Sequence, residues 1–331
     1  GRAGAPAWRL HVWDLQGPPR SWPAQLEAAT RAQPVFALVS GAGAADWAPV
    51  HRHCEAQRLP CLFPQVDAPG DTRPGRSSFY LSGGVAAEGA VVARALSGAT
   101  GGTAVPRWLQ LRLAGDAVAE AGAQALRSAL PAETEVVERV VGPGSVASWR
   151  QAVVDLRPGE AVMLWLRLHA LEAFVRAVPM PVPGVRWAHS GWLALPEAQA
   201  LTQPWREALL ATYPLDPPAR RERRLKFNLE PWLAGKAIAP APLAVLGNAL
   251  AACNLLTEGM MGLRGLASQA WLVEQIEAYP AAMGNAPAPQ ALPHFNLGPG
   301  RRISAHGAYL VRYGPEPGAA GLRPVGEWIA P

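Results

Sequence analysis

The 331-residue sequence contains little lysine and no basic stripe. Lysine occurs only at Lys226 and Lys236, and the arginines are dispersed apart from a run at 220–224, although the formal net charge is +5. A nucleic-acid-binding protein more often carries clustered basic residues interleaved with aromatic ones. We interpret the run as a solvated helix start or loop and expect no nucleic-acid partner; nucleic-acid contact there is the minor alternative.

Long apolar runs are also missing. No stretch of about 18 apolar residues occurs, which excludes a membrane-spanning helix of ordinary length. No signal peptide is recognisable. The sequence starts at Gly1, so a targeting segment that had been removed would leave no trace.

Cysteine is scarce, with three residues, Cys54, Cys61 and Cys253. Cys54 and Cys61 flank a predicted helix end and the following predicted strand, close enough to form a disulfide, which would indicate an oxidising compartment. Two buried thiols are an equally good interpretation. No cysteine pair has the close spacing of a zinc site and no C-x-x-C-H haem motif occurs, so we expect no metal site and no cofactor.

The usual enzyme motifs are absent. The sequence contains no G-x-S-x-G elbow, no G-x-x-x-x-G-K-[ST] phosphate loop and no H-E-x-x-H zinc motif. His51 and His53 are two residues apart, so on a helix they face different sides and do not share a metal. We therefore predict that the protein is not an enzyme and has no catalytic residues.

Apolar residues, by contrast, are abundant and patterned. Hydrophobic residues make up 50% and charged residues 17% of a chain whose length favours two compact lobes. Apolar runs such as 35–39 and 59–63 alternate with helical patterns such as 47–57, which is typical of a mostly parallel sheet covered by helices. This predicts an α/β fold. The patterns also predict a strand at 9–15 and a helix at 201–213.

Five stretches carry a family resemblance by their order along the chain. They are RLHVWDLQGPP, VFALVSGAG, LPCLFPQVDAPG, FYLSGGVAAEGAVVARAL and FNLGPGRRISAHGAYLVRY. In this order they resemble the type I periplasmic solute-binding proteins, the extracytoplasmic receptors of branched-chain-amino-acid-type ABC transporters. The resemblance covers nearly the whole chain.

The resemblance implies two Rossmann-like lobes joined by a three-segment hinge, with the ligand between them. Lobe one would hold residues 1–103 and 233–298, and lobe two residues 104–232 and 299–331. It further implies a periplasmic location, a membrane permease of an ABC transporter as partner, and a small polar ligand such as an amino acid, carboxylate or amide.

The sequence departs from the family in three places. The first strand–helix unit is absent before residues 9–15. The turn after residues 35–39 lacks the usual Ser or Thr and carries Asp46, which opposes an anion. Asp67 stands where the family often has a hydroxyl residue. A plain amino-acid carboxylate is therefore not a safe prediction for this ligand.

Candidate ligand-binding residues follow from the rule that ligands lie off the carboxyl ends of parallel strands. From both lobes this rule selects Ser40, Gly41, Gln65, Asp67, Tyr80, Asp116, Arg167 and Trp192. Arg167 ends an apolar strand, where a guanidinium can clamp a carboxylate. Ordinary turn residues and an exposed strand-end charge are the structural alternatives.

Two functional hypotheses from different classes follow. The first is a periplasmic solute-binding protein of an ABC transporter. The second is a ligand-sensing or accessory subunit of a periplasmic redox system, partnered by a cytochrome or dehydrogenase, because the family's usual binding residues are replaced. An α/β enzyme rests on fold class alone and ranks last.

Overall fold

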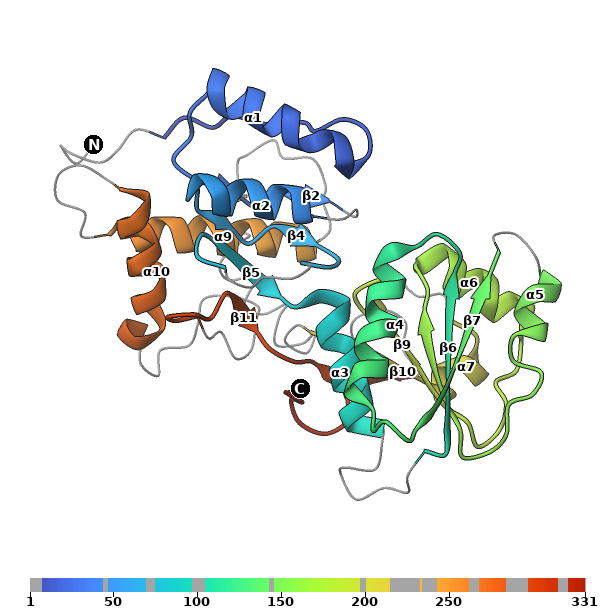
Figure 1. Cartoon of the computed structure of the whole chain (residues 1–331). Helices are drawn as coiled ribbons and strands as arrows, with labels where there is room; N and C mark the ends of the chain where they lie inside the picture. The colour runs from blue at the N-terminus through green and yellow to red at the C-terminus, as the bar shows by residue number, and fades with distance from the viewer. Residues whose placement is uncertain are drawn as a thin grey trace.

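The chain folds into two α/β lobes, each built around its own sheet (Figure 1). The computed structural model describes residues 8–43, 47–69, 75–96, 105–142, 146–196, 201–214, 233, 243–261, 268–283, 297–314 and 321–330. Among these residues no helix is both long enough and apolar enough to cross a membrane.

The first lobe contains a four-stranded parallel sheet. Its strands, in spatial order, are β1 (Leu38–Val39), β3 (Cys61–Leu62), β5 (Ser78–Ser82) and β11 (Ile303–Ala305). A separate parallel pair joins β2 (Ala42–Gly43) to β4 (Gln65–Val66). The helices of this lobe are α1 (Trp22–Ala32), α2 (Ala48–Gln57), α9 (Leu243–Met260) and α10 (Gln269–Met283).

The second lobe contains a seven-stranded mixed sheet. Its spatial order is β13 (Leu322–Pro324), β12 (Tyr309–Tyr313), β10 (Leu209–Tyr213), β9 (Arg186–His189), β8 (Ala161–Trp165), β6 (Arg107–Leu113) and β7 (Glu135–Val141). The strands from β10 to β7 are parallel, whereas β12 pairs antiparallel with β10 and β13 pairs antiparallel with β12. The helices are α3 (Gly84–Leu96), α4 (Ala117–Ala129), α5 (Val146–Gln151), α6 (Leu168–Ala177) and α7 (Gln203–Ala208).

Both faces of the second sheet are covered, which explains its continuous apolar strands. In β8 the residues alternate between two core clusters: Val162 and Leu164 belong to one, Met163 and Trp165 to the other. All of β8 is buried. Such a strand lies in the centre of a helix-covered parallel sheet.

The chain crosses between the lobes at three places. It passes from β5 to α3 through residue 83, returns somewhere between β10 and α9, and crosses again at 306–308 between β11 and β12. Most of the second crossing lies outside the described residues. Gly84 (φ +60) and Gly307 (φ +135) occupy left-handed conformations at the first and third crossings, which favour glycine.

Helix α3 packs against the second lobe. Its residues Val85, Val92 and Ala93 share a core cluster with β6 and α4, and Figure 1 shows α3 beside α4. The predicted lobe boundaries remain a prediction, and this packing favours placing the first boundary before α3. The linker expected at 97–103 lies outside the described residues.

Two predicted elements are wrong. Residues 9–15 form no strand: their burial alternates as in a strand, but no strand among the described residues pairs with them. The predicted helix at 201–213 ends at Ala208, and β10 follows it directly. Pairing of β10 with β9 and β12 overrides the local helical pattern.

Candidate functional site

Arg167 lies between two carboxylates that come from different lobes. Its Nη1 donates to Asp67 Oδ2 at 2.9 Å and its Nε donates to Asp116 Oδ2 at 3.0 Å. Asp67 follows β4 in the first lobe, whereas Asp116 and Arg167 follow β6 and β8 in the second. The side chain of Arg167 is 39% exposed, so the cluster borders solvent.

Asp116 is held in place by the helix that it begins. Its Oδ1 accepts from the backbone N–H groups of Val118 and Ala119, both at 3.1 Å, as the N-cap of α4. An aspartate at this position satisfies N–H groups that have no partner within the helix. The second carboxylate oxygen thereby stays directed at Arg167, which itself begins α6.

Asp67 is anchored through its backbone at the first crossing. Its carbonyl accepts from Val85 N–H at 3.0 Å, in the first turn of α3. Burial raises the pKa of the Asp67 carboxyl, while hydrogen bonds from Arg167 and Trp192 oppose that shift. A guanidinium stays charged at any ordinary pH, so a carboxylate at 2.9 Å from it is the ionised partner of an ion pair.

Trp192 is tied to a buried carboxyl that the sequence analysis missed. Its backbone N–H donates to Glu88 Oε1 at 2.9 Å, and the same carboxyl accepts from the hydroxyls of Ser190 and Thr212. Complete burial raises the pKa of Glu88 to about 7. A glutamate inside an otherwise apolar helix, VAAEGAVV, was the available sequence signal.

The first-lobe candidates Ser40, Gly41 and Gln65 lie together at the ends of neighbouring strands. The Oγ of Ser40 accepts from Asn248 Nδ2 at 3.4 Å, and Gln65 N–H donates to the Gly41 carbonyl at 2.6 Å. A side chain at Gly41 would meet the ring of Trp47 at 2.8 Å, so only glycine fits beneath that ring. Among the described residues, Gln65 Oε1 and Trp47 Nε1 are buried without a hydrogen-bond partner.

Tyr80 differs from the other candidates because it is fully buried in β5. Its hydroxyl pairs with Nδ1 of His51 at 2.8 Å, and its ring belongs to the first-lobe core. A structural role accounts for this residue, and we leave it out of the proposed site. Cys54 and Cys61 are free thiols in the same core.

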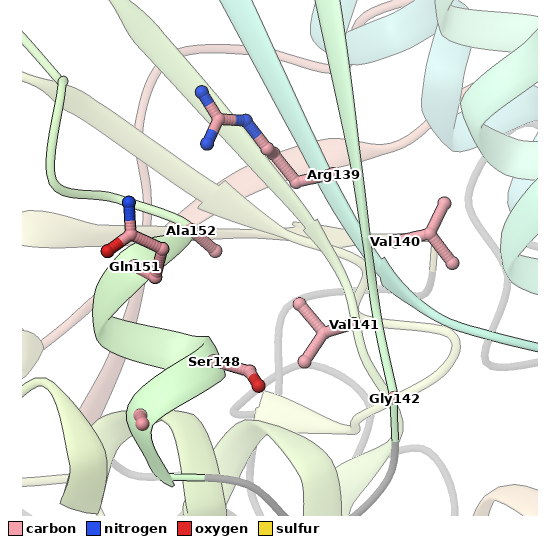
Figure 2. A pocket seen from close by; sticks show the side chains of 8 residues that line it. Arg139, Val140, Val141, Gly142, Ser148, Gln151 and Ala152 are labelled. Carbon is pink, nitrogen blue, oxygen red and sulfur yellow. The ribbon is translucent and has the colours of Figure 1, made fainter.

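A surface hollow of about 500 Å³ lies elsewhere, between β7 and α5 (Figure 2). Figure 2 shows Val140 and Val141 pointing to opposite sides of the strand, with Val141 on the side of Ser148. None of the eight predicted site residues lines this hollow. We place the candidate site at Arg167 because charged and polar groups from both lobes converge there. Within the described residues no group of three or more His, Cys, Asp or Glu side chains is placed to hold a metal ion.

Several solved structures share this architecture. A leucine-binding protein from Thermotoga maritima superposes with a TM-score of 0.67 at 14% identity, covering 96% of this chain and 87% of that chain. A branched-chain amino acid ABC transporter protein from Thermus thermophilus with bound valine gives 0.65 at 13% identity, covering 93% and 83%. A fatty acid ABC transporter substrate-binding protein from Thermomonospora curvata gives 0.63 at 13% identity, covering 93% and 79%.

The chain therefore has the two-lobed fold of the type I periplasmic binding proteins. The structures that it resembles include branched-chain amino acid ABC transporter proteins, so the resemblance inferred from the sequence is confirmed at the level of the fold. No protein-family model and no curated protein sequence matches the chain.

Proposed function

We propose that the protein captures a small polar ligand between its two lobes for an ABC transporter. The observation that carries this proposal is the convergence of Asp67 from the first lobe with Asp116 and Arg167 from the second. In two-lobed binding proteins, groups that meet across the lobes contact the ligand and also govern closure. A periplasmic location and a membrane permease as partner belong to the same proposal.

The charges of the cluster favour a zwitterion. Two carboxylates share one guanidinium, so the cluster carries one excess negative charge. A ligand carboxylate can take the place of Asp67 on Arg167, while the ligand ammonium binds the released Asp67. Structures with this fold are described as binding ligands as different as valine and fatty acids. The ligand class must therefore follow from the local charges of this chain.

Ligand capture would work through a shift between open and closed lobes. The ion pair between Arg167 and Asp67 joins the two lobes, so it stabilises the arrangement of the lobes in which it forms. A ligand that binds the closed form more tightly shifts the population toward it. The permease would then recognise the closed form.

The test is a thermal-shift screen with matched ligands. Amino acids are compared with their amides, which lack the carboxylate, and with their N-acetyl forms, which lack the ammonium. We expect an amino acid at 100 times its Kd to stabilise the protein by about 2.7 kcal/mol, and both derivatives to bind more weakly. A screen in which no compound raises the Tm would contradict the proposal.

A matched pair of variants distinguishes a specific role of Arg167 in binding from a general effect of removing one positive charge. Arg167→Gln removes the guanidinium of the cluster and should weaken ligand binding at least tenfold, about 1.4 kcal/mol. Arg176→Gln removes a charge from the exposed end of the same helix, α6, and should leave binding unchanged. Equal loss in both variants would show that Arg167 has no specific role.

The second hypothesis, an accessory subunit of a redox system, gains no support from the described residues. The comparisons identify transport proteins and no redox partner. We therefore carry only the solute-binding function forward.

A further inference from the structure

Two of the three cysteines lie side by side in the core of the first lobe. Cys54 is in the last turn of α2 and Cys61 is the first residue of β3, and their exposed fractions are 0% and 2%. Both belong to one core cluster, whose other members include Trp22, Trp47 and Tyr80. Neither thiol reaches solvent in the folded protein.

The turn between α2 and β3 brings the two cysteines together. Arg58 ends the helix in a left-handed conformation, with φ of 52°. Leu59 N–H then donates to the Cys54 carbonyl at 2.8 Å, which folds the chain back over the last helical turn. As a result, β3 begins beside the last turn of α2, which contains Cys54.

The two thiols are neighbours in this cluster, and Cys61 influences the ionisation of Cys54. The hydrogen bond with Cys61 and then burial raise the pKa of Cys54 well above its usual value, so the thiol is protonated at neutral pH. A buried, protonated thiol is unreactive toward external reagents. Oxidation therefore requires the core to be open, as it is during folding.

We propose that Cys54 and Cys61 form an intramolecular disulfide when the protein folds in the presence of a low-molecular-weight disulfide such as oxidised glutathione. One cysteine thiolate attacks a glutathione sulfur and expels one glutathione thiolate. The second cysteine then attacks the mixed disulfide and expels the other. The protein loses two electrons and two protons, which appear in two molecules of reduced glutathione.

The bridge would fasten the end of α2 to the start of β3. It closes a short loop, so its entropic contribution is at the small end of the usual range. The parallel pair β2–β4 flanks this unit in sequence and carries Gln65 of the proposed site. The bridge would stabilise the first lobe without contacting the Arg167 cluster.

Refolding under defined redox conditions tests the proposal. The unfolded, reduced protein is refolded with oxidised glutathione, then denatured and alkylated without reduction. We expect a mass about 2 Da lower before alkylation and one alkyl group, on Cys253. Trypsin cleaves after Arg58, so peptides 53–58 and 59–76 should stay joined until a reductant is added. Three alkyl groups on the oxidised protein, or a bridge to Cys253, would overturn the proposal.

Cysteine variants distinguish the effect of the disulfide on stability from other effects of a substitution on folding. Cys253→Ser removes the exposed thiol and should retain the bridge. Cys54→Ala should lose it, together with the Tm difference between oxidised and reduced protein, which we expect to be on the order of 5 °C. No Tm difference in Cys253→Ser would contradict a stabilising bridge even if the covalent link were found. The result does not depend on the solute-binding proposal, because no ligand is needed.

Discussion

The two lobes differ in the length and cover of their sheets. In the first lobe β1 and β3 pair over two residues each, and β1 lies at one edge of the sheet formed by the described strands. In the second lobe β6 and β7 pair over seven residues, and the central strands are covered on both faces. The second lobe is therefore the rigid partner, and we expect the first lobe to unfold at lower denaturant concentrations.

The contrast extends to side chains at the surface. Leu10 and Val12 in the first lobe are 86% and 83% exposed, and no strand in the described part of the chain pairs with the segment at 9–15. In the second lobe Trp187 and Trp205 are fully buried with their rings 4.9 Å apart. Leu10 and Val12 thus contribute little to stability, whereas Trp187 and Trp205 contribute through burial and ring contact.

The largest expected effect is loss of a tryptophan from the second core. Trp187→Ala removes a ring that contacts Trp205 and Phe174 and should cost about 3–5 kcal/mol of unfolding free energy. Leu10→Ala in the exposed segment should change it by less than about 0.5 kcal/mol. Urea denaturation followed by circular dichroism measures both. A comparable cost for Leu10→Ala would show that the contrast between the lobes is wrong.

The next effect depends on pH and tests whether α3 is fixed to the second lobe. The pKa of Glu88 is raised to about 7 by burial. The folded state therefore holds this proton more tightly than the unfolded chain does. The stabilisation of the folded state by protonated Glu88 is present at low pH and is lost as the pH rises through about 7. The free energy of unfolding falls by at most about 3 kcal/mol as a result.

Glu88→Gln should remove that pH dependence. The variant keeps an oxygen for Trp192 N–H and Thr212, and its stability relative to the wild type should rise between pH 5 and pH 8. Chemical denaturation at the two pH values gives the difference. Parallel pH profiles for variant and wild type would mean that Glu88 does not titrate in this range.

The smallest expected effect concerns the first crossing. A Cβ at Gly84 would lie 2.2 Å from the Asp67 carbonyl oxygen, in a left-handed conformation. Gly84→Ala should lower the free energy of unfolding by about 2 kcal/mol, because the backbone strain of the left-handed conformation and the displacement of Asp67 add together. Gly115 has a similar φ of +81 but open space around it, so Gly115→Ala should cost only about 1 kcal/mol. Equal costs, measured by thermal denaturation, would show that the contact with Asp67 does not constrain the crossing.

Much of this architecture was predictable because local pattern and tertiary position agree. The helical pattern at 47–57 folds as α2 (Ala48–Gln57), within one residue of the predicted bounds. Asp116 and Arg167 came together because the parallel strands β6 and β8 end at one edge of the second-lobe sheet, and Asp67 meets them from the end of β4 in the first lobe.

The wrong and missed predictions share a physical cause: a local sequence pattern carries no information about pairing between distant residues. The alternation at 9–15 is real, but a strand also needs a neighbour. Tyr80 was selected by the rule for strand ends, yet it is the middle residue of β5 and its side chain faces the core. A wholly buried strand gives no signal of which face is which. Glu88 was missed because its partners, Ser190 and Thr212, are more than one hundred residues away.

The shortness of two crossings limits how the lobes can move. One residue separates β5 from α3, and residues 306–308 separate β11 from β12. At about 3.5 Å per residue these links reach only about 7 and 14 Å. The two short links therefore act as a hinge. They allow the lobes to rotate about the line through residues 83 and 307, but they prevent a translation of one lobe away from the other.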